Sequence, residues 1–87
     1  MSVYMVEREL PGISMDQLAG AQKAAIDTSK QFTKDGKPVE YIRSMYVPGE
    51  AKVMCLFKAE NADTVREVND AAKIPYNRVV EAMDLTP

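Results

Sequence analysis

The order of strand and helix patterns along the chain constrains its fold more than any other feature. Four segments carry the alternating or continuous apolar pattern of strands, and two carry apolar residues at helical spacing. The strands are expected over Ser2 to Arg8, Val39 to Val47, Ala51 to Lys58 and Arg78 to Asp84. The order β-α-β-β-α-β predicts one α+β domain of the ferredoxin-like type over residues 1–87. Two right-handed crossovers then give a four-stranded antiparallel sheet with both helices on one face.

Local signals indicate where the helices and one hairpin begin and end. Ser14 opens a capping box, so the first helix is expected to begin there and to stop at Asp35 and the Gly-Lys-Pro that follows it. Asn61 is expected to cap the second helix, which ends before Pro75. The pair Pro48-Gly49 between the second and third strands predicts a type II turn.

Alternation along the strands divides their side chains between two faces of the sheet. The face assigned to the core under the helices holds Tyr4, Val6, Ile42, Ser44, Tyr46, Met54, Leu56, Val80 and Ala82. The opposite face holds Val3, Met5, Glu7, Tyr41, Arg43, Met45, Val53, Cys55, Phe57, Val79, Glu81 and Met83. A chain of 87 residues supplies only one layer of helices, and this second face is too apolar to remain in water. We therefore predict a homodimer in which two sheets pack face to face around a cavity, a dimeric α+β barrel.

The predicted open face also carries ionisable groups in its apolar setting. Glu7, Arg43 and Glu81 fall there, with Tyr41 and Cys55 nearby in the pattern. Buried charges cost several kcal/mol unless they are paired, and an arginine can bridge carboxylates in a bidentate manner. These five residues are therefore the predicted ligand-binding set. Three interpretations stay open: a structural salt bridge that fixes the dimer register, a pocket for a ligand or metal ion, and a catalytic acid–base role.

Composition excludes several classes of function. The net charge is −2, from 11 basic and 13 acidic side chains, which gives no basic footprint for nucleic acid. No apolar run is long enough for a membrane span. The single cysteine, Cys55, cannot form an internal disulfide, which fits a reducing, cytoplasmic location. It also excludes Cys-x-x-Cys metallochaperones and iron–sulfur proteins. Histidine, the commonest metal ligand and general base near neutral pH, is absent.

Four segments carry a resemblance to a known family. They are Tyr4 to Gly12 (YMVERELPG), Val39 to Ser44 (VEYIRS), Cys55 to Ala59 (CLFKA) and Pro75 to Ala82 (PYNRVVEA). In this order they resemble a small bacterial family, long filed as a domain of unknown function and typified by a dimeric, ferredoxin-like nickel-binding protein. The resemblance implies a homodimer and binding of a divalent metal such as nickel. Without histidine, the remaining candidate metal ligands are Glu7, Glu9 and Glu81, with Cys55 as a further donor.

These observations lead to three hypotheses for function. The first is a non-catalytic dimeric protein that binds a small molecule or a metal ion between its sheets, with no nucleic-acid or membrane partner. The second is an enzyme without an organic cofactor, of the isomerase or monooxygenase type built on dimeric α+β barrels, with Glu7 or Glu81 as general acid or base. The third is a purely structural interaction module, for which a dry, packed dimer interface is expected.

Overall fold

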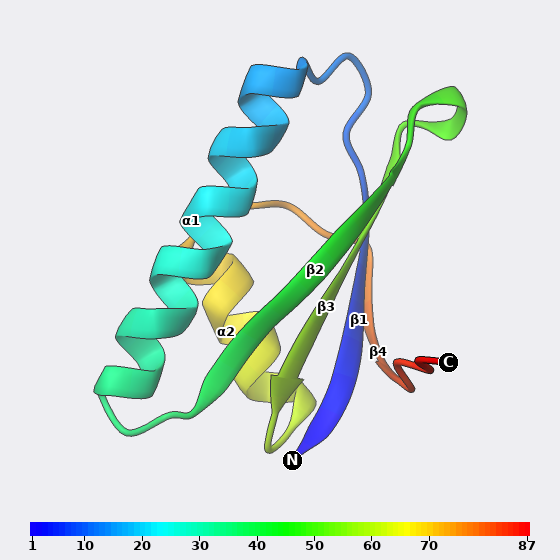
Figure 1. The fold of residues 1–87 in the computed structure, drawn as a ribbon. Coiled ribbons are helices and arrows are strands. Elements are labelled where there is room, and N and C mark those ends of the chain that lie inside the picture. The colour runs from blue at the N-terminus through cyan, green and yellow to red at the C-terminus, as the bar shows by residue number, and fades with distance from the viewer.

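The structure, a computed structural model, describes all 87 residues as two layers, a twisted sheet and a pair of helices on one of its faces (Figure 1). The strands are β1 (Ser2–Glu9), β2 (Val39–Val47), β3 (Lys52–Ala59) and β4 (Arg78–Ala82), and the helices are α1 (Met15–Lys34) and α2 (Ala62–Ala71). The sheet is antiparallel with strand order β2-β3-β1-β4, so β1 and β3 are central. The predicted β-α-β-β-α-β, ferredoxin-like fold is confirmed.

The helices begin where their capping residues are. The Ser14 hydroxyl accepts a hydrogen bond from the Gln17 backbone N–H at 3.1 Å, and the Gln17 side chain accepts one from the Ser14 N–H at 2.9 Å. Asn61 caps α2 through the Thr64 N–H at 2.9 Å. Each cap satisfies backbone donors that the first turn of a helix leaves free. Neither helix is long and apolar enough to cross a membrane.

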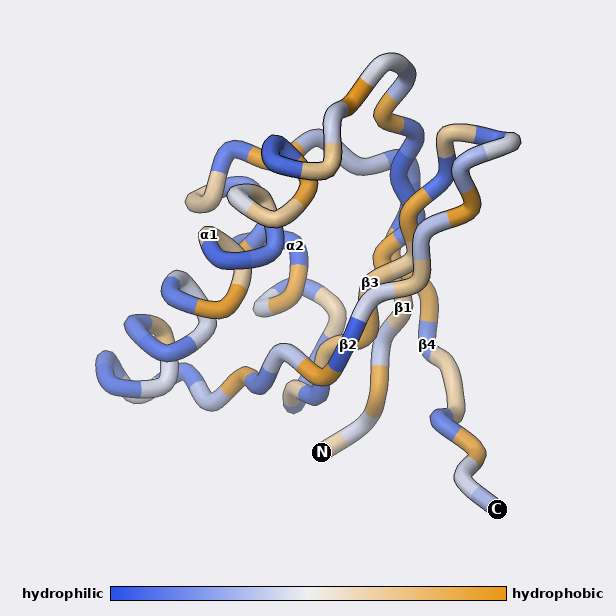
Figure 2. The backbone as a smooth tube through the Cα atoms, turned by 45° about the horizontal axis from the view of Figure 1, so that its top comes forward, coloured by the Kyte–Doolittle hydropathy of each residue, from blue (hydrophilic) through white to orange (hydrophobic).

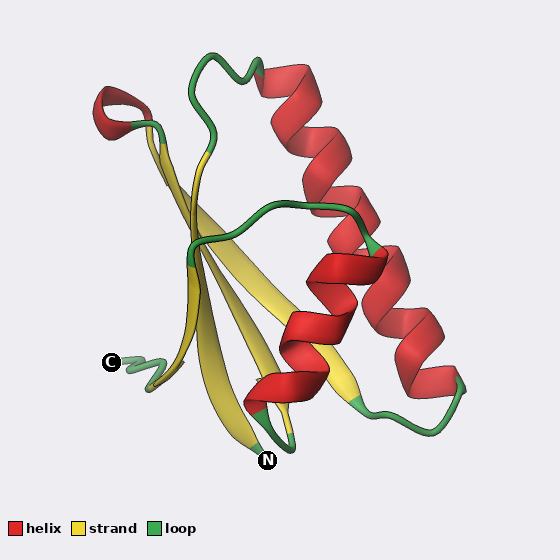
Figure 3. Cartoon of the chain, turned by 180° about the vertical axis from the view of Figure 1, so that it is seen from behind, coloured by secondary structure: helices red, strands yellow, loops and turns green.

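Both helices cover the same face of the sheet, which we call the helix face, and leave the other face open (Figures 1 and 3). α1 packs mainly on β2, whereas α2 packs on β3 and β4. In Figure 2, hydrophilic positions recur along α1 between hydrophobic ones, as expected for a helix with one buried side. The segment after β4 runs on the open side of the sheet (Figures 1 and 3).

The predicted type II turn between β2 and β3 is wrong. Pro48–Glu50 form one turn of 3₁₀ helix, and the left-handed residue is Ala51, with φ 54°, rather than Gly49. Proline at the start of a helical turn has the φ that the turn needs, so Pro48 favours this longer connection as readily as a two-residue one. Strand β4 also ends at Ala82, before the predicted Asp84.

The predicted division of faces is correct for β1 and wrong for β3. Tyr4 and Val6 of β1 are buried under the helices, but so are Val53, Cys55 and Phe57 of β3, which were placed on the open face. The register explains this, because Tyr4 lies opposite Phe57 and Val6 opposite Cys55, and directly paired residues share a face. Met54 and Leu56 therefore lie on the open face. The run from Val53 to Phe57 is apolar throughout, so its sequence contains no alternation that marks the buried side.

Strand β4 is likewise reversed relative to the prediction. Val79 is 8% exposed and belongs to the core, whereas Val80 and Ala82 pair with Met5 and Val3 on the open face. Glu81 lies opposite Tyr4 and is therefore on the helix face, where it is exposed at the sheet edge.

The prediction of faces is only partly correct for β2, because this strand contains a β-bulge. Tyr41 pairs with Phe57 and Arg43 with Leu56, so Ile42 is an extra residue without its own partner. The bulge brings Tyr41 and Ser44, three residues apart, to the helix face, while Arg43 and Met45 stay on the open face. Tyr41 was predicted on the open face, because a strict period of two was assumed through Ile42.

Candidate functional site

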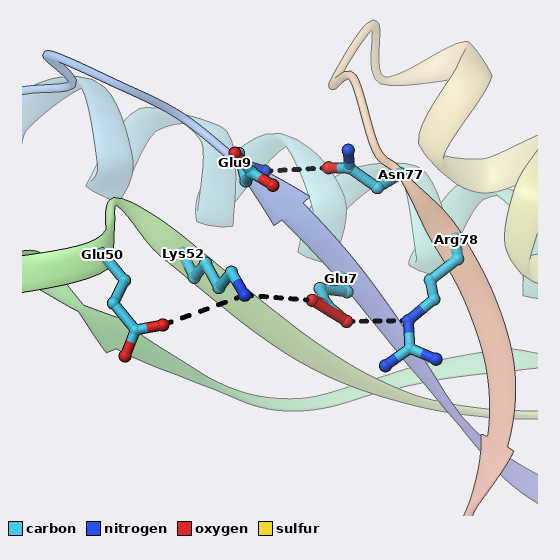
Figure 4. Close-up of polar contacts among 6 residues, drawn as sticks. All are labelled: Glu7, Glu9, Glu50, Lys52, Asn77 and Arg78. Carbon is cyan, nitrogen blue, oxygen red and sulfur yellow. Dashed lines mark hydrogen bonds and ion pairs between the residues drawn. The ribbon is translucent and has the colours of Figure 1, made fainter.

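Glu7 is the centre of an ion-pair network on the open face (Figure 4). Its Oε1 accepts a hydrogen bond from Nε of Arg78 at 2.7 Å, and its Oε2 lies 3.9 Å from Nζ of Lys52. Lys52 Nζ is also 3.8 Å from Oε1 of Glu50. The Glu7 side chain is only 18% exposed, so these pairs are less screened by water than ordinary surface pairs. The charge of Glu7 is thus compensated by cations of the same chain.

Arg43 does not join this network. It pairs with Asp84, in the segment that follows β4 on the open side of the sheet. The predicted bridge from Arg43 to Glu7 and Glu81 is therefore wrong: Glu7 pairs with Arg78 and Lys52, and Glu81 lies on the helix face. The missed partner, Asp84, is the last residue of the predicted fourth strand, but in the structure it lies after β4, where strand alternation does not link it to Arg43.

The helix face contains a cavity of about 150 Å³ between α1 and the β2–β3 half of the sheet. Its walls are mainly apolar and come from Leu10 and Ile74, from α1 and from both strands. The polar side chains in the wall are Arg8, Gln22, Tyr41, Ser44, Tyr46 and Cys55. Two of the predicted ligand-binding residues, Tyr41 and Cys55, thus meet at this cavity, and Glu7, Arg43 and Glu81 do not line it.

A chain of hydrogen bonds crosses one side of the cavity from α1 to β3. The Gln22 amide donates to the Tyr41 hydroxyl at 2.9 Å, Tyr41 is hydrogen-bonded to the Ser44 hydroxyl, and Ser44 donates to the Cys55 sulfur at 3.0 Å. Gln22 and Ser44 are exposed whereas Cys55 is buried, so the chain runs from solvent to the core. The bulge at Ile42 makes this chain, because a regular strand would place Tyr41 and Ser44 on opposite faces.

Arg8 lies in the cavity wall and is the largest of the fully buried side chains, with 2% of its surface exposed. Its Nη2 donates to Oδ1 of Asn69 at 2.7 Å, and its Nη1 donates to the Pro75 carbonyl at 3.3 Å. Asn69 is held in turn by its amide, which donates to the Val65 carbonyl at 2.8 Å. None of the seven ion pairs of the chain includes Arg8, and its Nε has no partner. The buried charge is therefore solvated only by neutral groups.

Tyr76 packs against the core near this arginine. Burial and, secondly, the carboxylate of Asp70 raise the pKa of Tyr76, while Arg66 and Arg8 act in the opposite direction. A phenol with a raised pKa stays protonated at neutral pH, so Tyr76 supplies no countercharge to Arg8.

Arg8, Ser44 and Gln22 are the site residues that sequence reasoning missed. Arg8 had a usable signal, because it follows Tyr4 and Val6 at the period of two that marks the buried face of β1. A charge at such a position indicates a special environment, since arginine is rarely buried without a reason. Gln22 had no comparable signal among the polar residues of α1.

A family model described as "Nickel responsive protein SCO4226-like" matches residues 4–82. The chain belongs to this family. Among solved structures, SCO4226 from Streptomyces coelicolor A3(2) matches with a TM-score of 0.82 and 21% identity, over 98% of this chain and 100% of that one. At this identity the structural match supports the shared fold. No curated protein matches the chain.

The side chains of this SCO4226-like protein do not fit a nickel site within a single chain. No three His, Cys, Asp or Glu residues are grouped closely enough to hold a metal ion. Of the predicted ligands, Glu7 and Glu9 share the open face of β1, whereas Glu81 is on the helix face. Glu7 is also engaged by Arg78 and Lys52, and the chain has no imidazole to offer nickel.

The contact between Arg8 and Asn69 predicts a strongly coupled pair of substitutions. Arg8→Met leaves the buried Asn69 oxygen without a donor and should lower the free energy of unfolding by about 1–3 kcal/mol. Asn69→Leu removes the shorter of the two hydrogen bonds of the buried guanidinium, leaves only the Pro75 carbonyl as its acceptor, and should cost about as much or more. The double variant removes both polar groups and should recover most of the loss. Urea denaturation of the four proteins measures the coupling; strictly additive losses would show that the two side chains act independently.

Proposed function

We propose that this protein is a homodimeric, non-catalytic binding protein that holds a small molecule in the cavity between α1 and the sheet. The observation that carries this proposal is the mainly apolar cavity whose wall includes the hydrogen-bonded side chains of Gln22, Tyr41 and Ser44. An apolar chamber with a few convergent polar groups is the common form of small-molecule sites. The pocket is thus proposed on the helix face rather than between the sheets.

A binding role is favoured over a catalytic one by the contacts of the polar groups. The Cys55 sulfur accepts its hydrogen bond from a serine hydroxyl, and the Tyr41 hydroxyl meets an amide and another hydroxyl. Such neutral groups orient a ligand, whereas a nucleophile requires a base within hydrogen-bonding reach.

The dimer is proposed to form through the open face, with a second copy of the chain as the occupant. Exposed or partly exposed apolar side chains lie across all four strands there: Val3, Met5, Met45, Val47, Met54, Leu56, Val80 and Ala82. Charges of both signs accompany them, with Arg43 and Arg78 more than half exposed beside Asp84 and Glu7. A patch of mixed charge around apolar residues is self-complementary when a two-fold axis places two copies face to face.

Occupation of the cavity is tested with benzyl alcohol, a neutral probe of the size of one ring. We expect saturable shifts of the Ala21 and Ala25 methyl resonances in NMR spectra, because both residues line the cavity. Ala21→Leu should fill the space and abolish the shift of the remaining Ala25 methyl resonance, whereas Ala19→Leu, at an exposed position on the same helix, should leave both shifts unchanged. No saturable shift in the wild type, or equal behaviour of the two variants, would refute the cavity as a binding site.

The dimer interface is tested by placing a charge at the centre of the open face. Met5→Asp should give a folded monomer in analytical ultracentrifugation, because Met5 lies opposite the apolar Leu56 and Val80, and an unpaired carboxylate in an apolar contact costs several kcal/mol. Met15→Asp is the matched control, since Met15 is a 69% exposed apolar residue on α1, away from the open face. A monomeric wild type, or a Met5→Asp protein that stays dimeric, would exclude this interface.

The family description makes nickel the metal to test. We expect no stoichiometric Ni²⁺ uptake in equilibrium dialysis, and equal residual uptake by wild type and by a Glu7→Gln/Glu9→Gln variant, because one protomer offers no grouped set of ligands. One ion per dimer in the wild type, lost in the double variant, would instead assign Glu7 and Glu9 to a metal site shared between two copies.

A further inference from the structure

The shape of the cavity limits its ligand to a compact, largely apolar molecule. About 150 Å³ is the size of space that admits one benzene-sized molecule. Aliphatic side chains make up half of the 12 lining residues: Leu10, Leu18, Ala21, Ala25, Val53 and Ile74. A sugar or a nucleotide would be too large and would leave its polar groups without partners against this wall.

Charge limits the ligand further. Arg8 is the only charged residue in the wall, it is almost fully buried, and it pairs with no carboxylate. A cation buried among neutral groups alone has no countercharge. In the low-dielectric interior, an opposite charge next to it would be strongly stabilising. A ligand carboxylate would provide it, and guanidinium is the side-chain group whose planar fork matches a carboxylate best.

The side of the cavity formed by Gln22, Tyr41 and Ser44 suits such a ligand. Gln22 and Ser44 are exposed, and exposed side chains change rotamers quickly, so this side can open without movement of the sheet. A carboxylate leaving water passes an amide and two hydroxyls, each able to donate a hydrogen bond to it.

From these three observations we infer that the cavity binds a compact apolar monocarboxylate, with its hydrocarbon part against α1 and its carboxylate facing Arg8. This inference rests on the proposed function of the cavity and adds the chemical class of the ligand. It assigns to Arg8 the recognition of negative charge.

Benzoate and benzyl alcohol, which share a ring and differ in charge, test the inference on the wild-type protein. Both are titrated with the Ala21 and Ala25 methyl resonances as the readout. We expect benzoate to bind about tenfold or more tightly than benzyl alcohol, the ratio that one charge-assisted contact provides.

The Arg8→Met/Asn69→Leu variant separates charge recognition from the shape of the cavity. Without the guanidinium, this variant should lose the preference for benzoate and bind the two probes with equal affinity. Arg8→Lys, which keeps the charge, should retain part of the preference. Urea denaturation shows whether each variant is folded at the titration temperature.

The outcomes of these titrations distinguish two failures. Equal affinity of the wild type for benzoate and benzyl alcohol, or an unchanged preference in a folded Arg8→Met/Asn69→Leu variant, would overturn the assignment of a carboxylate and leave the cavity as a site for neutral ligands. Absence of binding by either probe would overturn both this inference and the proposed function.

Discussion

The pairing of β1 with β3 is the interaction on which the rest of the structure depends. These are the two central strands, and their register places Tyr4 opposite Phe57 and Val6 opposite Cys55. A register moved by one residue would turn Met54 and Leu56 toward the helices and expose Phe57, which is fully buried. The same pairing brings Arg8 under the helices opposite Val53, and so determines the chemistry of the cavity wall.

Much of the fold follows from the sequence because several local signals agree. Capping residues mark the helix starts, and the order of patterns leaves few topologies for a chain of this length. The face on which each strand residue lies is harder to predict from the sequence, and the reasons differ between strands. Strand β1 alternates cleanly and was assigned correctly, whereas Val53 to Phe57 is apolar on both sides and gives no direction. The bulge at Ile42 results from the pairing of β2 with β3, and no local sequence pattern predicts it.

The candidate site divides in the same way. Tyr41 and Cys55 were predicted as ligand-binding residues, and both line the cavity. The prediction placed them on the open face, however, whereas the structure has both on the helix face. The prediction also named Glu7 and Arg43, which lie on the open face in separate ion pairs. Ion pairing depends on which flexible ends meet in space, as with Arg43 and Asp84, and alternation within strands carries no information about the segment after β4.

The bulge in β2 has a consequence beyond the orientation of Tyr41 and Ser44. Strand β2 is at the edge of the sheet, and a long regular edge is a template on which a further strand of another molecule can add by backbone hydrogen bonds. An interruption at Ile42 breaks that row of donors and acceptors near its middle. At the other edge, β4 is only five residues long. Both borders of the sheet thus resist the open-ended strand addition that leads to fibres.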